Sequence, residues 1–290
     1  MSDRLEQDLT QKSEFANMLM IELLFEDKPE LIDPDELLHA AEEKFGEVIP
    51  VSGDGNLLTF AVPKYTAKFS DAEVPAMVML AQDLEFSAEK IDGLERSQLW
   101  DVRDGGELLD RCRYKCFVSD FMGGAALEYK DRCEMILDWL ETVLPLFPNC
   151  KAVWTPTAGK LLTPDAVLNS SVPREHRFGY VCVNARFFNI EDTDDMIVDT
   201  LGMYAVDLPD VQLHFHGLDP NDVVNYAYNI CLYNYDNDVP IESGDPIDGL
   251  DDSGNISTDV EWSCCYEDSL IQPVRTVLDI EAGEFASGQR

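Results

Sequence analysis

The chain has 290 residues, 45% of them hydrophobic and 10% aromatic, so it can bury a full core and lacks the composition of a disordered protein. Its 57 acidic and 21 basic residues give a formal net charge of −36, which opposes binding to nucleic acid or anionic membranes and favours basic proteins or divalent cations. Residues 1–14 are too polar for a signal peptide and no apolar run is long enough to span a membrane, so we expect a soluble cytoplasmic protein.

The first predicted elements are a strand, a helix and two further strands. A nearly continuous apolar run at 18–25 indicates a strand that is buried on both faces. Asp33 followed by Pro34 is typical of a helix start, because the carboxylate accepts free backbone N–H groups and proline suits the first helical position. Two strands joined by a turn are predicted at 48–51 and 57–62.

A charged stretch with a double glycine interrupts this pattern at 83–110 and is interpreted as a loop or boundary. The alternation of strands and helices then resumes. A strand is predicted at 114–121 and a helix at 127–144, where apolar residues recur at helical spacing. Further strands are predicted at 152–155 and 180–188, with a short helix between them.

A strand followed by an Asp-Pro helix occurs a second time near the C-terminus. Residues 211–216 alternate as a strand, and Asp219 with Pro220 begins the next helix, which is consistent with an internal duplication. We therefore predict an α+β fold in which helices pack on a mixed β-sheet, built from two similar ferredoxin-like halves. The expected organisation is a polar lead at 1–14, one domain at 15–282 with halves at about 15–110 and 111–282, and a C-terminal tail at 283–290.

Acidic residues are locally unopposed between Arg186 and Arg275. This interval contains no Lys or Arg but 20 Asp and Glu residues. One of its loops concentrates carboxylates, which calcium would favour, although the spacing is not that of an EF-hand and a solvated turn-rich loop is the alternative. The candidate partner-binding residues are Asp236, Asp238, Glu242, Asp245, Asp248, Asp251 and Asp252.

His214 and His216 are the candidate metal ligands. Their spacing on a strand directs both imidazoles to one face, where further ligands from the fold could complete a zinc or iron site. The alternative is that both histidines are outward polar residues of a half-exposed strand.

Motifs of common enzymes are missing from the sequence. Gly159-Lys160 is followed by Leu161 rather than the Ser or Thr of a phosphate-binding loop, and there is no Gly-x-Ser-x-Gly or His-Glu-x-x-His motif. The eight scattered cysteines indicate buried thiols in a reducing compartment. A cysteine nucleophile near His176 or His39 stays an alternative, but nothing in the sequence places these groups together.

Four short motifs follow one another in the second half of the chain. They are Lys151-Ala-Val-Trp154-Thr-Pro156, Thr200-Leu-Gly202-Met203, Leu208-Pro209-Asp210-Val211 and Gly244-Asp245-Pro-Ile247. In this order they resemble a bacterial family called domain of unknown function 4261, and the N-terminal strand and Asp-Pro helix are similar to the start of that family. The resemblance spans about 18–265. It implies a bacterial cytoplasmic protein with a continuous α/β domain, and it brings no activity for any residue.

We expect a non-catalytic binding or adaptor module whose acidic surface engages a basic protein, as an immunity or inhibitor protein does. No cofactor and no catalytic residue is predicted. The alternative is a metal-dependent enzyme or metal-binding protein that uses His214 and His216.

Overall fold

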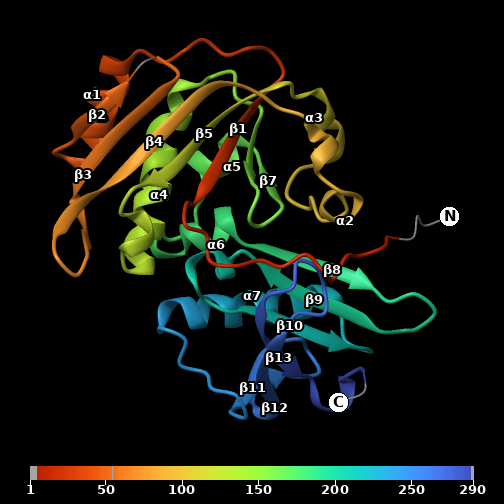
Figure 1. The fold of residues 1–290 in the computed structure, drawn as a ribbon. Coiled ribbons are helices and arrows are strands. Elements are labelled where there is room, and N and C mark those ends of the chain that lie inside the picture. Colours follow the sequence, from red (N-terminus) through yellow and green to blue (C-terminus); the bar gives the residue numbers. More distant parts are fainter. Residues whose placement is uncertain (1–4, 54, 289–290) are drawn as a thin grey trace. The chain divides into compact units, whose positions relative to one another are not determined.

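The computed structural model describes residues 5–53 and 55–288, and its contacts divide the chain into two compact units (Figure 1). The first, here called the N-terminal unit, is Ala16–Cys182. The second, the C-terminal unit, combines Met1–Phe15 with Val183–Arg290. The sequence analysis placed the boundary between the halves near residue 110, which lies inside the N-terminal unit because strands on both sides of it pair in one sheet.

The N-terminal unit is built on an antiparallel sheet in the order β2-β3-β4-β5-β1-β6-β7. Its strands are β1 (Met20–Phe25), β2 (Ile49–Gly53), β3 (Leu57–Lys68), β4 (Glu73–Glu85), β5 (Tyr114–Phe121), β6 (Ala152–Thr155) and β7 (Lys160–Leu162). Helix α1 (Pro34–Phe45) lies between β1 and β4 in the chain, and α4 (Tyr129–Val143) lies between β5 and β6. With β2 and β3 regarded as an inserted hairpin, this is the succession of a ferredoxin-like fold.

Helices α1 and α4 pack on one face of this sheet. Trp139 of α4 is fully buried against Phe45 of α1 and Phe60 of β3, and its indole N–H donates to the carbonyl of Met79. Short helices α5 (Pro164–Leu168) and α6 (Arg177–Cys182) complete the unit. Strand β1, in the middle of the sheet, is buried along nearly its whole length, which confirms the burial expected from its sequence.

The stretch 83–110 is not the loop that the sequence analysis predicted. After β4 ends at Glu85 it forms a 3-10 turn at Ala88–Lys90 and the short helices α2 (Gly93–Arg96) and α3 (Gly105–Arg111). Apolar side chains dispersed among its charges, including Phe86 and Leu109, pack on Leu24 and Trp154 over the second face of the sheet. Helices this short leave no periodic pattern for sequence analysis to find.

The C-terminal unit contains a mixed sheet in the order β11-β12-β13-β10-β9-β8, in which only β10 and β13 pair in parallel. Its strands are β8 (Asn184–Asn189), β9 (Met196–Leu201), β10 (Asp210–Phe215), β11 (Pro246–Leu250), β12 (Ile256–Asp268) and β13 (Thr276–Glu281). Helix α7 (Pro220–Asp236) packs on β8, β9 and β10. The two sheets with their helices confirm the α+β class. The ferredoxin-like succession occurs in the N-terminal unit, whereas this sheet follows a different order.

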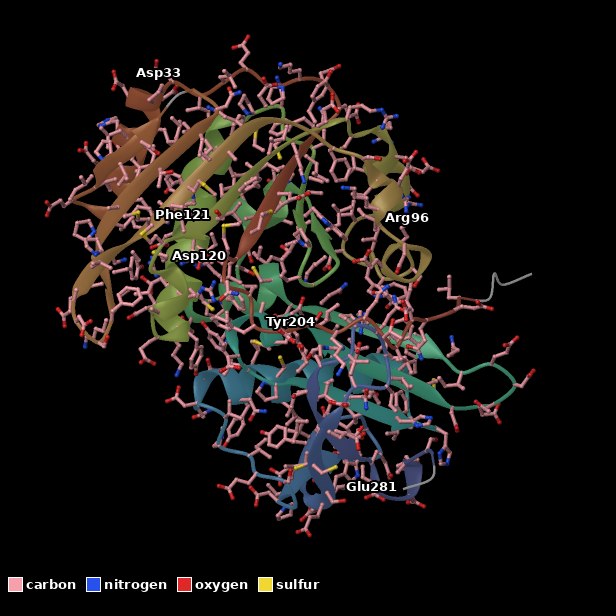
Figure 2. All side chains as sticks on the ribbon, in the orientation of Figure 1. Asp33, Arg96, Asp120, Phe121, Tyr204 and Glu281 are labelled. Atoms are coloured by element: carbon pink, nitrogen blue, oxygen red, sulfur yellow. The ribbon has the colours of Figure 1, made fainter. Side chains whose placement is uncertain are left out.

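Both units contain a strand, a helix capped by aspartate, a hairpin and a returning strand. The Asp33 carboxylate accepts two backbone N–H groups at the start of α1 (Figure 2), and that of Asp219 accepts one at the start of α7. The repeated elements are β1-α1-β2-β3-β4 and β10-α7-β11-β12-β13. In the first repeat β5 lies between β1 and β4, while β10 and β13 are direct neighbours in the second.

The described parts of the predicted lead and tail are bound to the C-terminal unit. Val274 N–H donates to the carbonyl of Gln11, and Ser13 N–H donates to that of Val274. At the other end, Ser287 N–H donates to the carbonyl of His214. Among the residues described, no helix combines the length and apolar character that crossing a membrane requires.

Candidate functional site

The seven candidate carboxylates, here called the acidic segment, run from the end of α7 to the turn after β11. Asp236 is the last residue of α7 and Asp248 lies on β11, which is an edge strand of the sheet. Asp236, Asp238, Glu242, Asp248 and Asp252 are exposed, whereas Asp245 and Asp251 are half-buried. These residues thus follow one another from the end of α7, along the edge strand β11, to the turn between β11 and β12.

The two half-buried carboxylates hold turns of this connection together. Asp245 accepts the backbone N–H of Glu242 at 2.9 Å. Asp251 accepts those of Ser253 and Asn255 at 2.8 and 3.0 Å, which closes the turn between β11 and β12. These two residues therefore shape the backbone, and the five exposed carboxylates are the ones that face solvent.

A tightly packed aromatic residue fixes the strand that carries Asp248. Trp262 of β12 lies over Gly249, where an added Cβ would come within 2.6 Å of the indole. Trp262 also packs edge-to-face on Tyr226 of α7, whose hydroxyl donates to the carbonyl of Asp248 at 2.8 Å. Of the exposed carboxylates, Asp248 is consequently the one held on a tightly packed base.

The two arginines that bracket the acidic interval are buried in the C-terminal unit. Arg186 of β8 makes two hydrogen bonds to Asp199 of β9, at 2.8 and 2.6 Å. Arg275 donates to Asp199 at 2.8 Å and to Asp210 at 2.9 Å. All four side chains are at most 3% exposed. Both guanidinium groups bind carboxylates in the core, so they do not neutralise acidic residues on the surface.

Asp199 links this network to the pH dependence of stability. Burial favours its protonated form, but the charges of Arg186 and Arg275 outweigh burial and lower its pKa below the ordinary value of 3.8. As the pH falls, Asp199 is therefore protonated in the unfolded chain before it is protonated in the folded protein. The ionised Asp199 stabilises the fold fully above the pKa that it has in the unfolded chain, and this stabilisation is lost as the pH falls through its pKa in the folded protein. We expect the difference in unfolding free energy between the protein and Asp199→Asn to be constant from pH 7 to about 5 and to shrink towards about pH 3. Urea unfolding across this range measures it, and an unchanged difference would refute it.

The two candidate metal ligands lie beside Asp195 and the C-terminal segment, where His216 is hydrogen-bonded and Nε2 of His214 is not. His214 Nε2 is 3.5 Å from Asp195 Oδ2, and His216 Nδ1 is 3.1 Å from Ser287 Oγ. Ser287 Oγ donates to Asp195 Oδ1 at 2.8 Å. Because the hydroxyl proton is directed to the carboxylate, His216 does not act as a base towards Ser287, and the cluster lacks the arrangement of a serine nucleophile.

The metal interpretation of His214 and His216 stays a prediction. Within residues 5–53 and 55–288, three potential ligand atoms come within 4.8 Å of one another at Cys265, Glu267 and Asp279, and no such group includes either histidine. Asp279 already accepts a hydrogen bond from Gln212 at 2.9 Å.

The thiols have the character of core residues. Seven of the eight cysteines are buried and Cys265 is half-buried, with none in a disulfide. Burial raises the pKa of Cys116 and Cys182 to about 12, which keeps them protonated and poorly nucleophilic at neutral pH. His39 is exposed beside Glu43 on α1, at 3.3 Å. Neither feature favours a cysteine nucleophile.

Each unit contains a cavity whose lining the structure describes. The cavity of the C-terminal unit has a volume of about 460 Å³ and is lined by Tyr204, Asp207, Tyr266 and residues of the N-terminal lead. The cavity of the N-terminal unit measures about 470 Å³ and is lined by β1, β5, β6 and the segment after β4. No sequence motif marked either cavity, because their walls come from residues far apart in the chain.

Comparison with known proteins identifies one family. Residues 199–281 match the family described as Domain of unknown function (DUF4261), which confirms the resemblance over this segment. The matched segment includes the 200–203, 208–211 and 244–247 motifs, and the 151–156 motif lies outside it. Searches of curated proteins and of solved structures found no match. The matched segment holds Asp199, Asp210, Arg275 and all of the acidic segment.

Proposed function

We propose that the protein is a non-catalytic binding module whose acidic segment engages a basic protein partner. The observation that carries this proposal is the burial of Arg186 and Arg275 against Asp199 and Asp210. Asp199 and Asp210 are two of the 20 carboxylates between the two arginines, and the other 18 lie in an interval that contains no Lys or Arg.

Such a distribution suits recognition of a cationic surface. An excess of carboxylates over basic residues creates a negative potential that accelerates encounter with positively charged proteins and disfavours acidic partners. The rigid base under Asp248 adds to this, because side chains on an ordered scaffold lose little conformational entropy on binding. An inhibitor that masks a basic protein fits this description.

The experiment compares two variants of identical net charge. The first neutralises the exposed part of the acidic segment by Asp236→Asn, Asp238→Asn, Glu242→Gln, Asp248→Asn and Asp252→Asn. The control neutralises five exposed carboxylates of the N-terminal unit by Asp27→Asn, Glu30→Gln, Glu42→Gln, Glu47→Gln and Asp71→Asn. The probe is cytochrome c, a basic model protein, and calorimetry measures its affinity at low and high salt.

We expect the first variant to weaken binding about tenfold, since five exposed charges at about 0.3 kcal/mol each amount to about 1.5 kcal/mol. Its binding should also depend less on salt than that of the wild type. The control should bind within about twofold of the wild type. Equal losses in both variants would show that net charge alone attracts the probe, and would overturn the acidic segment as a site.

A further inference from the structure

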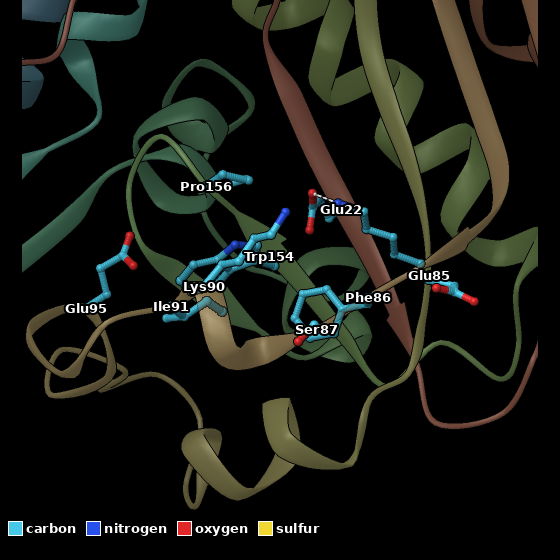
Figure 3. Close-up of a pocket in the computed structure, with 10 residues that line it drawn as sticks. Glu22, Glu85, Phe86, Ser87, Lys90, Ile91, Glu95, Trp154 and Pro156 are labelled. Carbon is cyan, nitrogen blue, oxygen red and sulfur yellow. Dashed lines mark hydrogen bonds and ion pairs between the residues drawn. The ribbon is translucent and has the colours of Figure 1, made fainter.

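The cavity of the N-terminal unit opens on the face of the sheet opposite to α1 and α4. In Figure 3 Glu22 extends from β1, while Phe86, Lys90 and Ile91 come from the segment that follows β4, with Trp154 of β6 beside them. The segment 86–112 covers part of this face, and the cavity lies at the edge of that segment.

An ion pair between a buried carboxylate and a half-buried ammonium group forms one wall of this cavity. Glu22 is the only charged residue of β1, lies in the middle of the sheet and is 6% exposed. Its carboxylate accepts a hydrogen bond from the ammonium group of Lys115 on β5. Two apolar side chains would stabilise the fold as well or better, because the Glu22 carboxylate loses its hydration and the half-buried Lys115 ammonium group loses part of its own. The fold alone therefore gives no reason for an ion pair here.

The remaining walls combine an apolar surface with a further charge. Phe86, Ile91 and Trp154 are buried and present their carbon surfaces to the cavity. Lys90 lines it as well, and among the described residues its ammonium group has no ion-pair partner. Glu85 and Glu95 also line the cavity, so a ligand meets the carboxylates of Glu22, Glu85 and Glu95, two ammonium groups and an aromatic wall.

We propose that this cavity binds a small zwitterion with an apolar body, of the class of a free leucine or phenylalanine. The ammonium group of the ligand pairs with Glu22, and its carboxylate pairs with Lys115 and Lys90. The apolar side chain of the ligand packs on Trp154 and Phe86. A volume of about 470 Å³ lies within the range of small-molecule sites, about 300–1,000 Å³. This site lies in the other unit from the acidic segment and does not depend on the proposed function.

The requirement for both charges follows from the ion pair. A ligand with only an amine would compete with Lys115 for Glu22 and leave an ammonium group without a partner. A ligand with only a carboxylate can pair with Lys90 but leaves Glu22 and Lys115 bound to each other, so it gains one new ion pair where a zwitterion gains two. A zwitterion satisfies both signs at once, and each lost charge-assisted hydrogen bond weakens binding at least about tenfold.

The test uses L-leucine as the probe, with 3-methylbutylamine as the analogue lacking the carboxylate and 4-methylpentanoate as the analogue lacking the amine. Calorimetry and NMR shifts of the Trp154 indole signal measure binding to the full chain. We expect leucine to bind at least about tenfold more tightly than either analogue. The absence of leucine and phenylalanine binding up to about 10 mM, or equal binding of one analogue, would overturn the proposal.

Two variants locate the site. Glu22→Gln with Lys115→Gln removes the ion pair at unchanged net charge and should weaken leucine binding at least about tenfold. The matched control, Glu26→Gln with Arg111→Gln, removes a partly exposed ion pair outside the cavity and should leave binding unchanged. Lys90→Met, at an exposed position that tolerates substitution, should weaken binding about three- to tenfold even if the double variant does not fold. Unchanged binding by Lys90→Met and the double variant would place leucine elsewhere.

Discussion

Replacing Arg275 by methionine should lower the unfolding free energy of the C-terminal unit by about 3–5 kcal/mol. Arg275 is the cation shared by Asp199 and Asp210, and its removal leaves two carboxylates in the core with only Arg186 to balance them. Methionine keeps much of the apolar stem, so the loss reports on the ion pairs and on the hydrogen bonds from Arg275 to backbone carbonyls rather than on a cavity. Urea unfolding followed by near-ultraviolet circular dichroism measures the change.

The matched control is Arg111→Met, since Arg111 pairs with Glu26 where both side chains are at least one-third exposed. Water replaces this partner easily, and we expect a loss of no more than about 1 kcal/mol. A loss of similar size for both variants would show that burial does not distinguish the two ion pairs, which would contradict the role given to the network.

Local sequence signals were sufficient for the elements that repeat between the units. The apolar run of β1 and the Asp-Pro starts of α1 and α7 depend on residues close together in the chain, and the structure confirms each of them. Helix capping and strand burial leave patterns within a few residues, which sequence analysis can read directly.

The pairing of distant strands left no such pattern. Strand β5 inserts between β1 and β4, and this joins residues on both sides of the expected boundary near 110 into one sheet. The short helices α2 and α3 were missed for a related reason. Their apolar residues satisfy a packing requirement set by Leu24 and Trp154, which lie far away in the sequence.

The candidate sites likewise depend partly on local sequence signals and partly on contacts between distant residues. The interval without basic residues was visible in the sequence, but the burial of its two flanking arginines required the fold. The cavity beside Glu22 was not predicted, although a single carboxylate within the apolar strand β1 was a usable signal. A charged residue in a strand that is predicted to be buried on both faces needs an oppositely charged or hydrogen-bonding partner. The position of such a pair is therefore a candidate site.

A second buried ion pair, in the N-terminal unit, gives the other large expected effect. Asp120 of β5 lies close to α4 (Figure 2), where its carboxylate accepts from Arg132 Nε at 2.6 Å and from Leu19 N–H at 2.6 Å. Both side chains of the pair are 1% exposed. Asp120→Asn keeps the shape and the acceptor for Leu19 but leaves a buried guanidinium group without its anion. We expect a loss of about 3–5 kcal/mol in urea unfolding.

The double variant Asp120→Asn with Arg132→Met separates the cost of an unpaired charge from the value of the pair. Arg132→Met alone leaves the Asp120 carboxylate in the core without its cation. Asp120→Asn alone leaves the Arg132 guanidinium group there without its anion. The double variant leaves neither charge in the core, and the carbonyl of Ala16, which loses the Arg132 donor, is half-buried and accessible to water. We therefore expect the double variant to be more stable than either single variant, and its loss to be at least about 2 kcal/mol smaller than the sum of the two. Additive losses would mean that Asp120 and Arg132 stabilise the unit through separate contacts rather than through their charge pair.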